Sequence, residues 1–216
     1  TNNFHTFYPK ELGALPLITT IENYSVSEQF IGISFLDKNY KSISENHTSF
    51  NKVSIEGNKA KYQSNISSLV YEYSQLSDGR KSDLVLQDVQ FLKNAPQATK
   101  YIAIKEIIEV PEGWKVLKGE NGIDFYDEKN TWRVNYETPV AYEEKIDKED
   151  DLNKGEIYFN ILSNNKVEIV SLFNYKWLIQ SNREYPLHLD PIVTYNPFLV
   201  TYSTGYMTGP SAGKAS

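Results

Sequence analysis

The chain has 216 residues, of which 40% are hydrophobic and 13% aromatic, and its 28 acidic and 22 basic residues give a formal net charge of −6. This length suits one large all-β domain or two small ones, and the apolar fraction is sufficient to build a core. Because the basic residues are scattered among acidic ones, the sequence disfavours nucleic acid as a partner, which requires concentrated positive charge. The longest apolar runs are far shorter than the roughly 20 residues that cross a bilayer, so we expect no transmembrane segment.

The sequence contains no cysteine, which excludes disulfides, thiolate metal sites and a cysteine nucleophile. It begins at Thr1, and its first residues do not show the basic stretch followed by an apolar stretch that is typical of a secretory leader. We interpret it as a mature or excised product, for which export is allowed.

The first 27 residues have a mixed composition, in which Pro9, Gly13 and Pro16 break any long period. We expect an N-terminal arm over residues 1–27 and an all-β module over 28–194, which could contain two sub-domains. Residues 195–216 would then begin a further strand and continue as a linker, since the last nine are small and polar.

Short segments with the composition of β-strands recur every 8 to 15 residues or so, and no long amphipathic helix separates them. The expected strands are residues 30–36, 50–55, 60–63, 68–73, 83–86, 89–92, 99–110, 114–117, 123–126, 131–136, 139–142, 157–162 and 167–172. The pattern predicts an all-β fold, either a β-sandwich or two stacked antiparallel sheets with little helix. The turn residues 163–165 predict that the strands 157–162 and 167–172 form a hairpin. Residues 173–180 could hold one short helical turn.

The segment 185–194 is an alternating apolar run that contains two prolines and one aspartate. Its alternation places Leu187 and Leu189 on one face of a strand, with His188 and Asp190 on the other. Because proline cannot donate to a β-ladder, the segment is expected to be an edge strand, or a strand that bends where it leaves the sheet.

The order of several segments resembles a known family. These segments are 68–73, 83–86, 138–144 and the stretch with Tyr185, Pro186, Asp190, Pro191 and Thr194, followed by Tyr202 and Gly205. They resemble a β-rich N-terminal domain of large surface proteins of Bacteroidetes-like bacteria, which closes with a similar "YPxxxDPxxT" stretch before propeller-like or adhesin repeats. The resemblance implies a secreted or cell-surface location, as in adhesins or gliding-associated proteins exported by type IX secretion. It implies no catalytic residue.

The acidic segment 147–153 is the strongest candidate for metal chemistry. Asp147, Glu149, Asp151 and Asn153 stand at alternate positions and could offer oxygen ligands to Ca²⁺. An EF-hand would require glycine and glutamate where this chain has Leu152 and Tyr158, so a looser calcium loop or a plain solvated loop remain the two interpretations. No other cofactor is expected.

The aromatic residues also allow two interpretations. Trp132, Tyr136 and Tyr142 could form a platform that stacks on sugar rings, or they could fill the core between two sheets. The three histidines are too dispersed for a metal motif, and no nucleophile motif is present.

The sequence therefore predicts a non-catalytic structural or adhesive module of a larger exported protein, with a carbohydrate-binding module as the alternative. The expected partners are other domains of the same large chain, or a surface or secretion partner that joins by strand addition. Glycans are the expected partners under the alternative.

Overall fold

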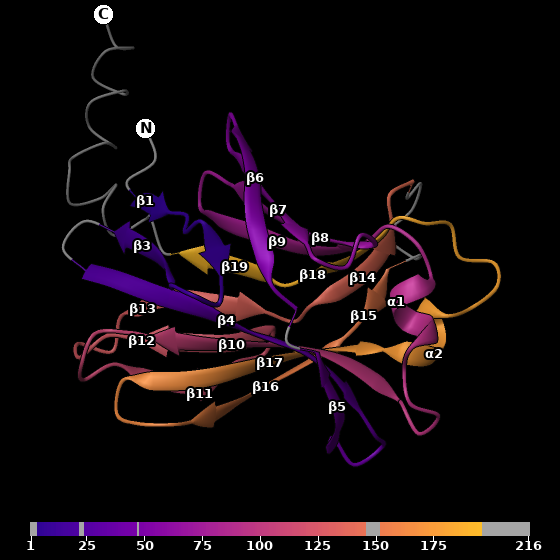
Figure 1. Cartoon of the computed structure of the whole chain (residues 1–216). Coiled ribbons are helices and arrows are strands. Elements are labelled where there is room, and N and C mark those ends of the chain that lie inside the picture. Colours follow the sequence, from indigo (N-terminus) through magenta and orange to yellow (C-terminus); the bar gives the residue numbers. More distant parts are fainter. Residues whose placement is uncertain (1–3, 22–23, 47, 146–151, 196–216) are drawn as a thin grey trace, which may run out of the picture.

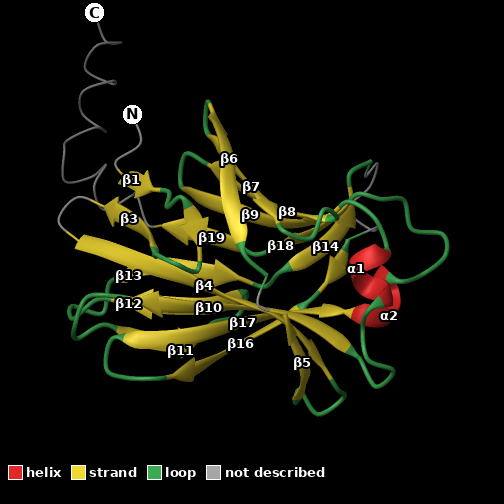
Figure 2. Ribbon diagram, viewed as in Figure 1, coloured by secondary structure: helices red, strands yellow, loops and turns green. Residues whose placement is uncertain are grey.

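The computed structural model describes residues 4–21, 24–46, 48–145 and 152–195, and within these ranges the protein is an all-β sandwich of two antiparallel sheets. Figure 1 follows the chain through both sheets, and Figure 2 shows that the two short helices lie together at one side. The expected fold class is confirmed.

The smaller sheet has the order β1-β3-β4-β10-β17-β16, and β5 pairs with β4. Its strands are β1 (Phe4–Phe7), β3 (Leu17–Ile21), β4 (Tyr24–Leu36), β5 (Ser42–Asn46), β10 (Tyr101–Glu109), β16 (Glu156–Ile161) and β17 (Lys166–Asn174). The hairpin expected over 157–172 is confirmed as the pair β16 and β17.

The larger sheet has a main path and a branch. Its strands are β2 (Glu11–Leu12), β6 (Phe50–Glu56), β7 (Lys59–Ser64), β8 (Leu69–Gln75), β9 (Gly79–Leu86), β11 (Lys115–Lys118), β12 (Gly122–Tyr126), β13 (Trp132–Glu137), β14 (Val140–Glu143), β15 (Asn153–Lys154), β18 (Leu187–Asp190) and β19 (Ile192–Tyr195). The main path runs β11-β12-β13-β19-β9-β8-β7-β6-β2, and β18 joins β9 to β14 and, through it, to β15.

The first 27 residues contribute to both sheets. β1 and β3 pair with each other, β3 pairs with β4, and β2 pairs with β6 on the larger sheet. Phe4, Leu12, Leu17 and Ile21 are all buried, so this segment helps to build the core.

Of the two forms expected for the segment 185–194, the edge strand is wrong, and the segment instead breaks at Pro191 into two strands inside the sheet. β18 lies between β14 and β9, and β19 lies between β13 and β9. The prolines are accommodated because Pro186 precedes β18 and Pro191 falls at the break between β18 and β19. The carbonyl oxygen of Pro191 accepts hydrogen bonds from the backbone N–H and the hydroxyl of Ser82, at 3.3 and 2.8 Å.

Two short helices complete the described chain. The expected strand 89–92 is instead helix α1 (Gln90–Lys93), because Asp88 Oδ1 accepts the Gln90 N–H at 2.7 Å and begins a helical turn that buries Phe91 and Leu92. The helical turn expected within 173–180 is confirmed as α2 (Tyr175–Leu178). No helix of the described chain has the length and apolar character needed to cross a membrane.

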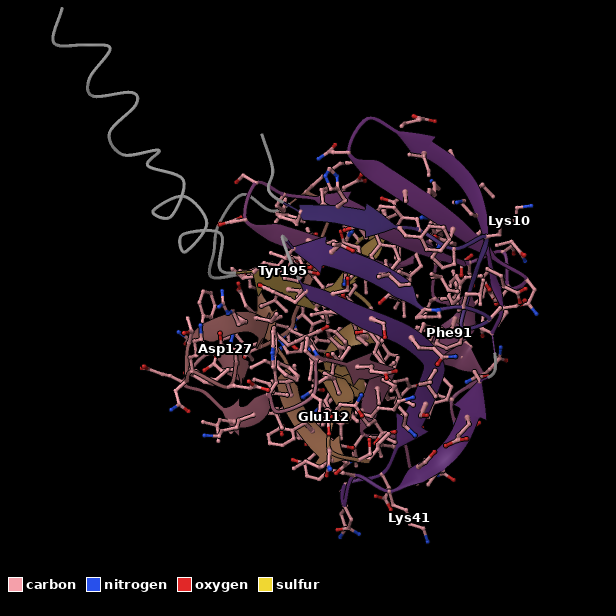
Figure 3. The ribbon with its side chains drawn as sticks, turned by 90° about the vertical axis from the view of Figure 1, so that its left-hand side faces the viewer. Lys10, Lys41, Phe91, Glu112, Asp127 and Tyr195 are labelled. Carbon is pink, nitrogen blue, oxygen red and sulfur yellow. The ribbon has the colours of Figure 1, made fainter. Side chains whose placement is uncertain are left out.

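Side chains fill the space between the sheets (Figure 3). A buried polar layer that includes Arg80 and Glu28 lies between two apolar clusters, since Arg80 contacts Tyr73 of one cluster and Tyr195 of the other. The guanidinium of Arg80 on β9 reaches across to the carboxylate of Glu28 on β4, with Nη1 to Oε1 at 2.8 Å and a second hydrogen bond from Nη2 to Oε2. The Tyr195 hydroxyl lies 3.1 Å from Thr19 Oγ1 and 3.3 Å from Glu28 Oε1. This ion pair joins the two sheets at the centre of the molecule.

Candidate binding surface on the larger sheet

Five polar side chains gather on the face of the larger sheet that is turned away from the smaller sheet. We call this group the lysine cluster; it consists of Lys81, Asp83, Tyr142, His188 and Asp190. Strand alternation positions it, because the neighbouring Leu84 and Leu189 point into the core while the residues beside them point the other way. The cluster therefore forms where β9, β18 and β14 lie side by side.

The ammonium group of Lys81 is the centre of the lysine cluster. It lies 3.3 Å from Asp83 Oδ2 and 3.2 Å from Asp190 Oδ2, and it donates to the Tyr142 hydroxyl. Burial lowers the pKa of Lys81, but the charge of Asp190, the hydrogen bond to Tyr142 and the charge of Asp83 outweigh it, so the pKa is raised. Burial also raises the pKa of Tyr142. At neutral pH the amine and the phenol are thus both protonated, which makes neither of them a nucleophile.

His188 and Asp190 contribute the β18 side of the lysine cluster. The imidazole of His188 stacks on the ring of Tyr142 at 4.9 Å with an interplanar angle of 7°, and its Nδ1 lies 3.6 Å from Asp83 Oδ1. Asp190 is 3% exposed. Burial, together with the charge of Asp83, raises the pKa of Asp190 to about 7, although Lys81 acts in the opposite direction. The cluster thus holds a buried carboxyl group with a raised pKa on the outer face of the larger sheet.

A shallow pocket lies on the same sheet, along β13 and its neighbours β12 and β19. We call it the Trp132 pocket; it has a volume of about 450 Å³ and is lined by Glu120, Asn121, Asp124, Trp132, Asn135, Glu137 and Thr194. Asp124 Oδ1 accepts hydrogen bonds from Trp132 Nε1 at 3.1 Å and from Asn135 Nδ2 at 2.8 Å. The Thr194 hydroxyl donates to Glu137 Oε1 at 2.6 Å. These contacts hold the polar side chains in place on three adjacent strands.

A β-bulge decides which way Trp132 points. The register between β12 and β13 shifts so that Phe125 pairs with Val134 while Tyr126 pairs with Trp132, which leaves Arg133 as the extra residue. Arg133 turns toward the smaller sheet, where its guanidinium lies 5.5 Å from the ring of Tyr24. The side chain of Trp132 therefore lies on the outer face of the sheet, beside Asp124.

The three aromatic residues considered as a platform lie in three different environments. Tyr136 is 1% exposed and packs against Phe125 in the core, so it does not belong to an exposed platform. Trp132 lines the pocket just described, and Tyr142 belongs to the lysine cluster. They are separated because the bulge divides Trp132 from Tyr136, and because Tyr142 lies on a second strand beyond the break at Pro139.

Three of the four expected calcium ligands, Asp147, Glu149 and Asp151, lie outside the described residues. Asn153 lies on β15 opposite Ala141, and its Oδ1 is buried with no hydrogen-bond partner in the described part of the chain. Among the residues that the structure describes, no group of three or more acidic or histidine side chains could hold a metal ion.

The residues of the YPxxxDPxxT stretch have identifiable structural contacts. Tyr185 donates its hydroxyl to the carbonyl of Leu178 at 3.1 Å, and Asp190 binds Lys81. Neither Lys81 nor Asp83 was predicted as a site residue, because the expected strand 83–86 covers only the second half of β9 and leaves out Lys81. A longer strand could have been predicted from the alternation of Arg80, Ser82 and Leu84 with Lys81 and Asp83, which puts the last two side chains on one face.

Comparison with protein-family models, with curated proteins and with solved structures found no match for this chain.

Proposed function

We propose that this chain is a non-catalytic adhesive module of a larger exported surface protein, and that it binds glycans through the Trp132 pocket. The observation that carries the proposal is the geometry of that pocket, in which an indole lies beside carboxylate, amide and hydroxyl groups on a rigid sheet. A sugar offers an apolar ring face and several hydroxyls that both donate and accept hydrogen bonds. Such a ligand matches an aromatic ring flanked by fixed polar groups.

The protonation states in the lysine cluster support the non-catalytic part of the proposal. The amine of Lys81 and the phenol of Tyr142 could act as nucleophiles only in their deprotonated forms. Lys81 and Tyr142 are held protonated, and Asp83 and Asp190 share the Lys81 ammonium. The cluster thus joins β9, β18 and β14 with mutually paired charges.

A glycan array followed by titration of the best ligand tests the binding function. We expect retention of at least one neutral glycan, because the pocket is lined by carboxylates and has no basic side chain among its described lining residues. Trp132→Ala should lose about 5- to 10-fold in affinity, since stacking on an aromatic side chain contributes on the order of 1 kcal/mol. Trp177→Ala is the matched control, because Trp177 lies on α2 and packs against Arg183 instead. Equal binding by Trp132→Ala and the unmodified protein would refute the assignment of the pocket.

The surface location has its own test. An antibody raised against this domain should label intact cells of the source organism, and brief protease treatment of whole cells should remove the signal. Labelling that appears only after lysis would contradict export while leaving the glycan measurement unaffected.

A further inference from the structure

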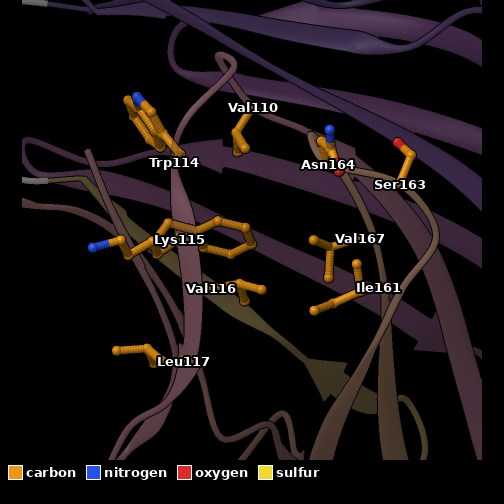
Figure 4. A pocket seen from close by; sticks show the side chains of 10 residues that line it. Val110, Trp114, Lys115, Val116, Leu117, Ile161, Ser163, Asn164 and Val167 are labelled. Carbon is orange, nitrogen blue, oxygen red and sulfur yellow. The ribbon is translucent and has the colours of Figure 1, made fainter. Parts of the chain in front are cut away.

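An apolar cleft opens between the edge strands of the two sheets. It has a volume of about 370 Å³ and lies between β11, the last strand of the larger sheet, and the hairpin of β16 and β17 (Figure 4). Its apolar lining residues include Val110, Val116, Phe125 and Val167. The cleft is thus a gap in the side of the sandwich over the core.

Both walls of the cleft are edge strands with backbone groups that the described ladder does not use. In an antiparallel pair, residues alternate between those that bond their neighbour and those whose N–H and C=O point away. Gly119 N–H bonds the Gly122 carbonyl at 3.0 Å in the turn between β11 and β12. Because bonded and non-bonded residues alternate from that pair, Leu117 and Lys115 bond β12, and the backbone groups of Val116 and Lys118 point outward, away from β12.

The two edges touch at one end and separate toward the other. Lys118 Nζ donates to the carbonyl oxygen of Ile157 on β16 at 2.7 Å, which closes the sandwich at that point. Toward Trp114 and Ser163 the walls diverge, and Val116 points across the cleft toward Val167 (Figure 4). The gap has the form expected where one further strand could lie beside β11.

Exposed apolar side chains surround this gap. Leu117 is 54% exposed, Ile161 66% and Leu162 52%. On an edge strand, such residues together with unpaired backbone groups are a template for strand addition.

The charges of β11 select among possible partners. Lys115 and Lys118 are exposed, and their ammonium groups contact only neutral acceptors among the described residues, namely Asn130 Oδ1 and the Ile157 carbonyl. If β11 of a second copy paired antiparallel with this strand, the outward backbone groups of Val116 would bond those of Lys118 in the second copy. The four lysines of the two strands would then stand on one short ribbon, where their like charges repel each other. A second copy is therefore disfavoured, and a strand with carboxylates opposite both lysines is favoured.

We propose that β11 accepts an added strand from a partner polypeptide, whose segment has two apolar residues flanked by acidic residues three positions apart. The backbone of this segment pairs with Val116 and Lys118, and one apolar side chain enters the cleft. This inference is independent of glycan binding, since Trp132 does not line the cleft.

The test uses two capped synthetic peptides, Thr-Glu-Val-Val-Glu-Thr and its lysine counterpart Thr-Lys-Val-Val-Lys-Thr, titrated into the ¹⁵N-labelled protein and followed by NMR. We expect saturable shifts at the amides of Val116 and Lys118 with the acidic peptide and about 10-fold weaker binding of the basic one, because two favourable charge pairs become repulsive. The double variant Lys115→Glu/Lys118→Glu should reverse this preference.

A second variant separates strand pairing from charge. Val116→Pro removes an outward N–H that β12 does not use, so it should abolish binding of both peptides while the other amide shifts and the melting temperature are retained. Equal affinity for the two peptides, or shifts confined to other strands, would overturn the proposal. It would also be overturned if decanoate bound the cleft while neither peptide did, or if sedimentation revealed a dimer that Val116→Pro dissociates.

Discussion

At the scale of single residues, the Arg80–Glu28 pair is the most consequential contact of the described structure. Arg80 is 1% and Glu28 is 4% exposed, so each charge has lost nearly all of its hydration and depends on the other. The pair need not add net stability relative to an apolar pair of the same size. Removing one partner, however, leaves the other charge buried without compensation.

Arg80→Met should therefore lower the free energy of unfolding by about 3–5 kcal/mol, as measured by urea denaturation. Lys61→Met is the matched control. It breaks the exposed Lys61–Glu72 pair, whose atoms lie 3.3 Å apart, and should cost less than about 1 kcal/mol. A small effect of Arg80→Met would mean that water reaches Glu28.

Glu106 on β10 makes stability depend on pH. Burial, together with the charge of Glu28, raises the pKa of Glu106 from 4.5 to about 7, against the opposing effect of Arg80. Between these values the folded protein binds a proton that the unfolded chain does not, so the free energy of unfolding falls as pH rises through this window. Asp190 acts in the same direction between 3.8 and about 7.

Glu106→Gln should reduce the loss of stability between acidic and neutral pH, because glutamine does not titrate. Urea denaturation on either side of the window measures the difference. Asp190→Asn should reduce the loss separately, since Asp190 lies on the outer face of the larger sheet. A pH dependence that neither variant changes would contradict both assignments.

At the scale of secondary-structure elements, the meander of β11, β12 and β13 depends on a backbone conformation at Gly122 that residues with a side chain rarely adopt. Gly122 has φ +154°, and a Cβ atom there would lie 2.0 Å from the carbonyl oxygen of Tyr136 on the next strand. The pairing of β12 with β13 therefore requires glycine at this position.

Gly122→Ala should destabilise the protein by about 2–4 kcal/mol, because it combines backbone strain with a clash against backbone. Gly57→Ala is the control that separates the two effects. Gly57 has φ +58°, and a Cβ atom added there would have no neighbour within 4 Å, so its cost should be only about 1 kcal/mol. Thermal unfolding of both variants measures the difference, and equal losses would show that the clash is relieved by movement of β13.

At the scale of the whole molecule, the polar layer separates two apolar clusters, but the strands run through both. β4 contributes Val26 to one cluster and Phe30 to the other, and β10 contributes Ile108 and Ile102 in the same way. Because the same strands carry both clusters, neither cluster can lose its packing without disturbing the other.

We therefore expect a single unfolding transition. Trp114 packs against the cluster that contains Ile108, and Trp177 against the cluster that contains Ile102. Variants that lack Trp132 and retain only one of these two tryptophans should give the same urea midpoint by fluorescence. This midpoint should coincide with that from far-ultraviolet circular dichroism. Two separate midpoints would instead indicate two units that unfold independently.

Local patterns in the sequence were sufficient for the all-β class, for most strands and for the hairpin of β16 and β17, because alternation and turn residues act over a few positions. They also placed the side chains of Leu187 and Leu189 on one face of a strand and those of His188 and Asp190 on the other face. Tertiary structure decided the features that depend on contacts between residues far apart in the sequence. It placed β18 and β19 inside the sheet, turned Trp132 outward at a bulge, and paired Arg80 with Glu28. No local pattern encodes these outcomes, since strand order and the neutralisation of a buried charge arise only when distant segments pack together.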